Sequence, residues 1–405
     1  MEKTGGPARR RLEQTHELWH RALDAYPRVD DFCLAVNNLL QTLRTVTFVL
    51  QKSLRHVEGF DAWYADRQRE MGDDDLMKWA VAARNHIEKE GDLDLQSTAR
   101  VSITTTWLAA PYDDFEIPPL IPPEAIAEAL LPRNIPGRIQ RDGVFSVERR
   151  WVTASLPSHE LLEACAHVYQ VLAEVVWAAE AKFGIHDGNA SPDTEPPRRL
   201  DCMVAGRDAR TARLNLQTGE FMAHERIEPA PPTEEAMGRV EARYGDSIRR
   251  LGRPGDSMEE RIRWYHGLGR TMLEADGYHI MVMFVFRGGR PIASIRLQPE
   301  DQQDKYVLME HVADDLLTYE ADEVIVSGEV WMAPMDTDVE RAWVRPADRK
   351  DRIEGFVTYG ANQKGSSLTL TTEFDRVDGK IVMQDIQESG VYPNALLPIR
   401  RAWER

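Results

Sequence analysis

The sequence predicts a multidomain protein in which an N-terminal all-α, up-down helical bundle is followed by an α+β domain with a mixed or antiparallel sheet. Three observations support this fold class. The chain has 405 residues, which is too long for one compact core. Apolar residues near the N-terminus recur at helical spacing. Towards the C-terminus, short strand-like segments alternate with turn residues, as in α+β domains.

The composition narrows the class of protein. The formal net charge of −17 argues against a duplex-DNA binder, which needs a basic face, but leaves a local groove for single-stranded RNA open. The cysteines Cys33, Cys165 and Cys202 are odd in number and widely spaced, which is typical of a reducing compartment. The N-terminus resembles no secretory signal, and no apolar stretch approaches the ~20 residues that span a bilayer. We therefore expect a cytoplasmic protein without membrane contact.

The N-terminal helices follow from apolar periodicity and end signals. The second is the clearest, because Asp30 and Asp31 stand where carboxylates suit the first turn and apolar residues then share one face. Gly91 is a C-terminal stop signal for the last of the four. The expected helices cover residues 9–25, 30–50, 59–71 and 74–90. Short connections between them favour an up-down bundle.

After an interruption, the chain is predicted to add one more helix that packs on this bundle. Residues 99–107 alternate as in a strand, the prolines of 117–123 interrupt the pattern, and a long helix covers 158–183. We predict that residues 1–184 form the bundle, with an insertion at about 96–157. Residues 185–199 have the composition of a linker, and 200–405 form the α+β domain.

The C-terminal domain is predicted from strands and turns. Gly288-Gly289 separates two strands, and Asp378-Gly379 is typical of a type I′ hairpin. The expected strands cover 278–286, 292–297, 323–332, 353–359, 367–375 and 380–386, with a helix at 304–320.

One motif suggests a metal. His16, Glu17 and His20 spell HExxH, in which two histidines one helical turn apart bind zinc and the glutamate polarises a bound water. This pattern makes a zinc hydrolase one alternative. The other interpretation is an amphipathic helix with both histidines near the surface, because no substrate-binding sheet is predicted before this segment. We expect no metal and no cofactor.

The segment from Arg84 to Asp92 carries a dense group of charges at a helix end. Arg84, Asn85, His86 and Lys89 are the candidate residues. An arginine stabilises charge on a phosphate, and a histidine exchanges a proton near neutral pH. The structural alternative is that Arg84 pairs with Glu88 one helical turn away.

Across roughly residues 10–180, the sequence resembles the HEPN superfamily (higher eukaryote and prokaryote nucleotide-binding domain). The resemblance is carried by Arg84-Asn85 and by the helices around this motif. It implies a helical bundle, a homodimer and, in active members, a metal-independent ribonuclease that uses the RNA 2′-hydroxyl. Lys89 stands where the family has its histidine.

Two functions follow from the resemblance. A lysine with an ordinary pKa of ~10.4 is a poor general base, so we favour a catalytically degenerate HEPN-like binding or regulatory protein linked to RNA, phage defence or toxin-antitoxin biology. The alternative is a ribonuclease that uses Arg84 with Lys89 or His86. Whether the protein is an enzyme stays open. The expected partners are RNA, a nucleotide, a protein or a second copy of the chain.

A basic run in the C-terminal domain is a second candidate for phosphate contacts. It includes Arg345 and Arg349, which we assign with Arg84 and Lys89 as candidate nucleic-acid or partner contacts. Asp348 and Asp351 lie within the run, so a solvated loop is the alternative.

Overall fold

The computed structural model describes residues 6–107, 109–111, 115–131, 135–184, 200, 202–203, 206, 209–222, 233–334 and 344–404. The chain forms two compact units, one of residues 1–105 and 109–224 and the other of residues 106–108 and 225–405. The predicted linker at 185–199 lies outside the described residues. The first unit continues beyond that segment to residue 224.

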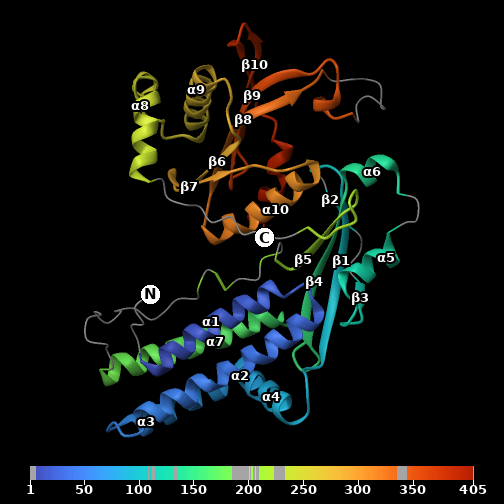
Figure 1. Ribbon diagram of the computed structural model, residues 1–405. Helices are drawn as coiled ribbons and strands as arrows, with labels where there is room; N and C mark the ends of the chain where they lie inside the picture. Colours follow the sequence, from blue (N-terminus) through green and yellow to red (C-terminus); the bar gives the residue numbers. More distant parts are fainter. Residues whose placement is uncertain are drawn as a thin grey trace. The chain divides into compact units, whose positions relative to one another are not determined.

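The first unit contains the predicted N-terminal helices. They are α1 (Pro7–Asp24), α2 (Val29–Leu54), α3 (Phe60–Asp73), α4 (Asp75–Lys89) and α7 (Leu161–Phe183). Figure 1 shows α1, α2 and α7 side by side. The apolar face of α2 lies in their shared core, where Phe32, Leu39 and Val46 are at most 1% exposed. The helix periodicity read from the sequence is thereby confirmed.

The same unit also holds an antiparallel sheet, so an all-α description of the N-terminal half is wrong. Its strands are β1 (Leu95–Thr104), β2 (Ala109–Pro111), β3 (Phe115–Ile117), β4 (Val144–Thr153) and β5 (Thr211–Asn215). The order is β2-β1-β4-β5, with β3 also paired to β1. The short helices α5 (Pro123–Leu130) and α6 (Gly137–Asp142) lie between β3 and β4. Trp151 of β4 is fully buried in the helical core and donates from its indole Nε1 to the carbonyl of Tyr26 at 3.1 Å. The sheet and the helices therefore form one unit.

Among the helices that the structure describes, α2 and α7 are long and apolar enough to cross a membrane by length and composition. In the structure both contribute to the core of the first unit, where they contact each other and α1. Their apolar character is explained by this burial, because a helix that is covered on several sides needs an apolar surface on each of them.

The second unit is built on an antiparallel sheet, as predicted. Its order is β11-β10-β9-β8-β6-β7, and every neighbouring pair is antiparallel. The strands are β6 (Val282–Arg287), β7 (Arg290–Arg296), β8 (Glu323–Met332), β9 (Ile353–Asn362), β10 (Ser367–Val377) and β11 (Lys380–Ser389). The turn between β10 and β11 has φ values of 51° at Asp378 and 75° at Gly379, as a type I′ hairpin requires.

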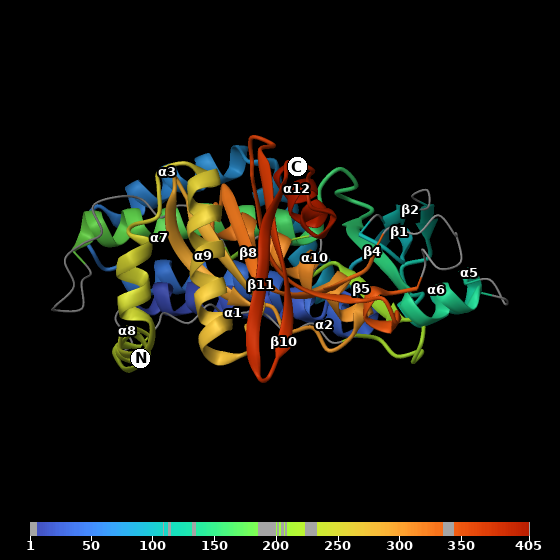
Figure 2. The same cartoon turned by 90° about the horizontal axis from the view of Figure 1, so that it is seen from above.

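Helices cover both faces of this sheet. Side chains alternate along β8, so Ile325 packs with α9 (Met258–Asp276) while Val324 and Val326 pack with α10 (Gln302–Thr318) and α12 (Leu397–Trp403). Figure 2 shows α8 (Glu234–Leu251) beside α9, and β10 beside β11 as a long hairpin. Two short 3₁₀ helices, η1 (Pro346–Asp348) and η2 (Asn394–Leu396), complete the described elements. The sequence predicted α10 and the strands but not α8, α9 or α12.

Candidate metal centre

Helix α1 places His16 and His20 on one side, one turn apart. The helix starts at Pro7, whose fixed φ suits a first helical position. Trp19, which is fully buried, donates from its indole Nε1 to the carbonyl of Leu162 in α7 at 2.9 Å. This contact fixes the rotation of α1 about its axis. Both histidines are therefore held at the border of the helical core, where they are partly exposed.

Cys202 completes a group of three potential ligands. His16 Nε2 lies 3.0 Å from His20 Nε2 and 3.1 Å from Cys202 Sγ, and one ligand atom from each residue lies within 4.8 Å of the others. Cys202 is 186 residues away from His16 along the chain. The fold, and not local sequence, brings these three side chains together.

His16 Nε2 has more close contacts than one hydrogen bond requires. An imidazole nitrogen offers one in-plane position, which holds either a proton or a lone pair. His16 Nε2 has two close neighbours, so it can form a good hydrogen bond to only one of them. Two nitrogen ligands at ~2.0 Å from a tetrahedral zinc ion would lie about 3.3 Å apart, which is close to the observed spacing. The donor set fits an ion with small adjustments of the side chains.

The surroundings favour a neutral imidazole at His16 and place aromatic rings against both histidines. Burial lowers the pKa of His16 below its ordinary value, and the charge of Glu17 offsets part of this effect. Trp19 meets His20 edge-on at 5.2 Å between ring centroids, and the Tyr169 ring of α7 lies 6.0 Å from that of His16. Burial, with a smaller effect of Cys202, raises the pKa of Tyr169 to about 12. Glu17 is exposed and is not part of the ligand group, so the HExxH roles are not reproduced.

A short turn holds Cys202 in position. Met203 is 1% exposed in the core of the helices, and its amide donates to the carbonyl of Leu200 at 2.9 Å. Leu200 and Cys202 pack against the same core. Sequence reasoning missed Cys202 as a ligand because no second cysteine or histidine stands at ligand spacing from it. Its only signal was a thiol in a chain that carries HExxH.

The Arg84 segment lies at the end of α4. Arg84 pairs with Glu88 at 2.5 Å and donates to the side-chain oxygen of Asn85 at 3.2 Å. His86 lies 3.1 Å from the carbonyl oxygen of Asp92 and 3.2 Å from Glu90. Lys89 is exposed. These contacts match the structural alternative, and the structure does not test the proposed roles of the four residues.

The basic run near η1 is also paired with acidic neighbours. Arg345 contacts Asp348 at 2.8 Å, and Arg349 contacts Asp351 at 2.7 Å. Each ion pair lies within the same short loop, as the solvated-loop alternative predicts. A phosphate-binding role for Arg345 and Arg349 stays a prediction.

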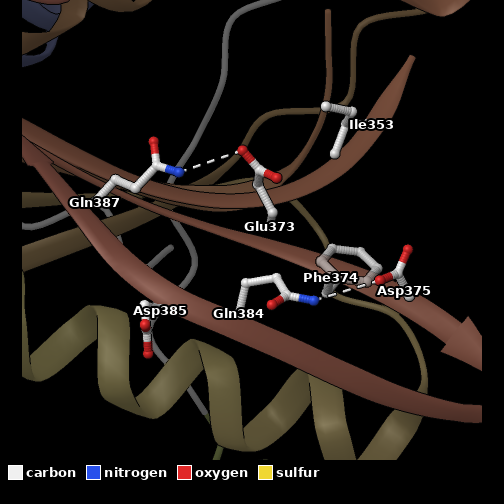
Figure 3. A pocket seen from close by; sticks show the side chains of 7 residues that line it. All are labelled: Ile353, Glu373, Phe374, Asp375, Gln384, Asp385 and Gln387. Atoms are coloured by element: carbon white, nitrogen blue, oxygen red, sulfur yellow. Dashed lines mark hydrogen bonds between the residues drawn. The ribbon is translucent and has the colours of Figure 1, made fainter. Parts of the chain in front are cut away.

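The second unit has a hollow of about 330 Å³ over β9, β10 and β11 (Figure 3). Gln387 donates to Glu373 at 3.3 Å, and Gln384 donates to Asp375 at 3.4 Å. The full lining is Ile353, Glu373, Phe374, Asp375, Gln384, Asp385 and Gln387. Its carboxylates already have amide partners or face solvent, and we assign no ligand to it.

Fold and site together define a two-unit α+β protein with a potential metal centre of two histidines and one cysteine in its first unit. The chain belongs to the family described as bacteriophage lambda protein ea47, whose sequence model matches residues 6–405. Protein ea47 of Escherichia phage lambda is 27% identical over 347 residues, which is 81% of this chain and 80% of the phage protein. No solved structure matches the chain.

The family membership corrects the predicted identity and function. The resemblance to the HEPN superfamily is wrong, because the ea47 match extends through both units, whereas the HEPN resemblance rested on a short motif in one. The HEPN-like regulatory protein, the ribonuclease and the zinc hydrolase are overturned with it, as are the links to RNA binding and toxin-antitoxin biology. In the structure, Arg84 forms an i,i+4 ion pair with Glu88, as the structural alternative predicts.

Proposed function

We propose that this member of the ea47 family binds one transition-metal ion of the zinc class through His16, His20 and Cys202. The observation that carries the proposal is the meeting of three ligand atoms within 4.8 Å, contributed by a helix and a turn that are far apart in sequence. A thiolate and two imidazoles select zinc or cobalt over magnesium or calcium, which prefer oxygen ligands.

The proposed role is binding, without hydrolysis. Three protein ligands leave one tetrahedral position, which water would fill. A hydrolase also needs a base beside that water, and Glu17, the residue at the expected sequence position, does not belong to the group. The ligand group therefore supports a structural ion, one that connects helix α1 to the turn around Cys202.

We further propose that the protein acts in the cytoplasm of the phage's host. Its family and its relative in phage lambda support a viral gene expressed in a bacterium. Among the described residues, which include every cysteine of the chain, no disulfide forms. A reducing compartment would keep the thiol of Cys202 available as a ligand. Protein and self-association partners stay predictions.

Metal analysis of the purified protein tests the binding proposal. Protein loaded with zinc and freed of excess ion is expected to retain one ion per chain, and cobalt(II) loading is expected to produce a thiolate-to-cobalt absorption band in the near ultraviolet. Cys202→Ser should remove the band. Cys33→Ser is the matched control, because Cys33 is a partly buried thiol on α2 outside the group. Wild-type protein that retains far less than one ion, or Cys202→Ser protein that keeps the band, would overturn the proposal.

A further inference from the structure

We infer that strand β11 (Lys380–Ser389) pairs with β11 of a second copy of the chain, antiparallel, across a two-fold axis between Gln384 and Asp385. The strand ends the sheet order, and among the described strands it pairs with β10 alone. The other edge of its backbone is therefore available to a further strand. The inference is independent of the proposed metal site, which belongs to the first unit.

The β11 edge is less protected than the opposite edge of the same sheet. Strand β11 is ten residues long and contains neither proline nor glycine. The opposite edge strand, β7, has seven residues, contains Pro291, and begins and ends with Arg290 and Arg296. Short length, proline and charge are devices that prevent two sheets from pairing edge to edge. We therefore expect a partner strand at β11 and not at β7.

A β-bulge in the middle of β11 reverses the alternation of its side chains. Thr372 and Phe374 of β10 are separated by one residue, whereas their partners Ile386 and Met383 in β11 are separated by two. Directly opposed residues share a face of the sheet, so Met383 and Ile386 lie on the same face although an odd number of positions separates them.

Contacts with α9 identify this face on both sides of the bulge. Before the bulge, Ile381 and Met383 pack on the cluster that contains Leu273 of α9. After it, Glu388 pairs with Arg263 of α9 at 2.8 Å. The residues of β11 that face α9 are therefore Ile381, Met383, Ile386 and Glu388.

The neighbouring residues face the other side. Val382 lies opposite Asp375, and Gln387 donates to Glu373 at 3.3 Å; Asp375 and Glu373 both line the hollow in Figure 3. On either side of the bulge, residues at equal distances from the midpoint of β11 thus share a face. This symmetry is a property that an antiparallel copy of the same strand requires, and an unrelated partner strand does not.

The symmetric register also gives compatible side-chain pairs. Near the axis, Ile386, which is 48% exposed, lies opposite Met383 of the second copy. The opposed residues, one from each copy, are Lys380 and Ser389, Ile381 and Glu388, Val382 and Gln387, Met383 and Ile386, and Gln384 and Asp385. No two like charges are opposed. An axis through Asp385 would instead place this carboxylate opposite its own copy, which is unfavourable.

Sedimentation equilibrium of the full-length protein measures the proposed dimer. Ile386→Asp is expected to raise the dissociation constant at least about tenfold, because it places a carboxylate against Met383 at two symmetric positions. Val377→Asp is the matched control and should leave the constant unchanged. Val377 is an apolar residue of β10 that is 52% exposed and lies outside the pairing edge. Circular dichroism checks that both variants fold.

Cross-linking tests the register. A mixture of Val382→Cys and Gln387→Cys proteins should be joined by a short thiol-specific cross-linker, because these positions are opposed, with Cβ atoms about 5 Å apart. Val382→Cys protein alone should be joined far less, since its two added thiols would be five positions out of register, roughly 17 Å apart. The native cysteines are present in both samples and so provide the same background.

The outcomes decide the inference. Wild-type protein that stays monomeric at every concentration overturns it, and leaves the β11 edge to a strand of another protein. A dimer that Ile386→Asp does not weaken also overturns it, because the copies then meet through another surface. Equal cross-linking of the mixture and of Val382→Cys alone rejects the proposed register and with it the two-fold axis between Gln384 and Asp385.

Discussion

The Nε2 atom of His266 lies 2.9 Å from Thr372 Oγ1, and its Nδ1 atom lies 3.1 Å from Thr358 Oγ1. These three side chains are completely buried between α9 and the sheet of the second unit, where Ser327 extends the group through a 3.0 Å contact with Thr358. Both ring nitrogens thus have hydroxyl partners, but no carboxylate lies among those partners to balance a positive charge.

This arrangement predicts acid sensitivity. Burial, assisted by the charge of Arg270, lowers the pKa of His266 from 6.5 to about 4. Because the folded state holds the imidazole neutral, its contribution to stability is complete above pH 6.5 and is lost as the pH falls towards 4. The expected loss by pH 5 is ~2 kcal/mol. Urea unfolding at pH 7.5 and pH 5 should show a smaller pH dependence in His266→Gln than in wild type; equal dependence would contradict the prediction.

A buried ion pair holds α9 to β8. Arg261 Nε donates to Glu323 Oε1 at 2.8 Å, and each side chain is 7% exposed. Arg261→Met should reduce the free energy of unfolding by ~3 kcal/mol, because it leaves the Glu323 charge buried without its partner. Two residues along the helix, Arg263 pairs with Glu388 at half-exposed positions, so Arg263→Met should cost less than ~1 kcal/mol. Similar urea midpoints for the two variants would refute this ranking.

Two glycines of α9 should respond oppositely to alanine. A Cβ at Gly269 would collide with the buried ring of Phe356, so Gly269→Ala should destabilise the protein by ~2 kcal/mol. A Cβ at Gly267 meets only a methyl carbon of Leu251 at 3.0 Å, and the helix propensity of alanine favours that variant by up to ~1 kcal/mol. Thermal unfolding measures both; the prediction fails if Gly269→Ala is the more stable variant.

The end of α4 should prove to be structural. Asn37 Nδ2 donates to Asp92 Oδ1 at 2.7 Å and so connects α2 to the chain after α4. Asp92→Ala should therefore cost ~1 kcal/mol, as expected for a partly exposed, charge-assisted hydrogen bond. Arg84→Ala, which removes the surface pair with Glu88, should cost less than ~0.5 kcal/mol. Chemical denaturation that ranks Arg84→Ala as the more damaging change would show that Arg84 has a larger role than this ion pair.

The sequence predicted the elements whose signals lie between residues close together in the chain. The face of α2 and the Asp378-Gly379 turn follow from spacing and turn chemistry, and both are present. Strand β4 was missed because it carries buried Arg149, whose guanidinium donates to the carbonyl of Pro119 at 3.0 Å and thereby satisfies a charge that looks exposed in sequence. Helix α9 was missed although Ser257 and Glu260 form a capping box. Its buried face includes the polar residues Arg261 and His266, and these interrupt the apolar periodicity by which a helix is recognised in a sequence.

The candidate metal site likewise has residues that the sequence predicted and one that it did not. His16 and His20 were recognised because an interval of four residues places them together on any helix. Cys202 was not, because its place beside His16 depends on the packing of α1, α7 and the turn around Met203, and no interval along the chain encodes that packing.

The distance in sequence between the ligands also sets an order of events during synthesis. His16 and His20 leave the ribosome early, and Cys202 follows 186 residues after His16, close to the end of the first unit at residue 224. A complete ligand set therefore exists only when almost all of that unit has been translated. Capture of an ion would mark the completion of the N-terminal unit while most of the second is still being made.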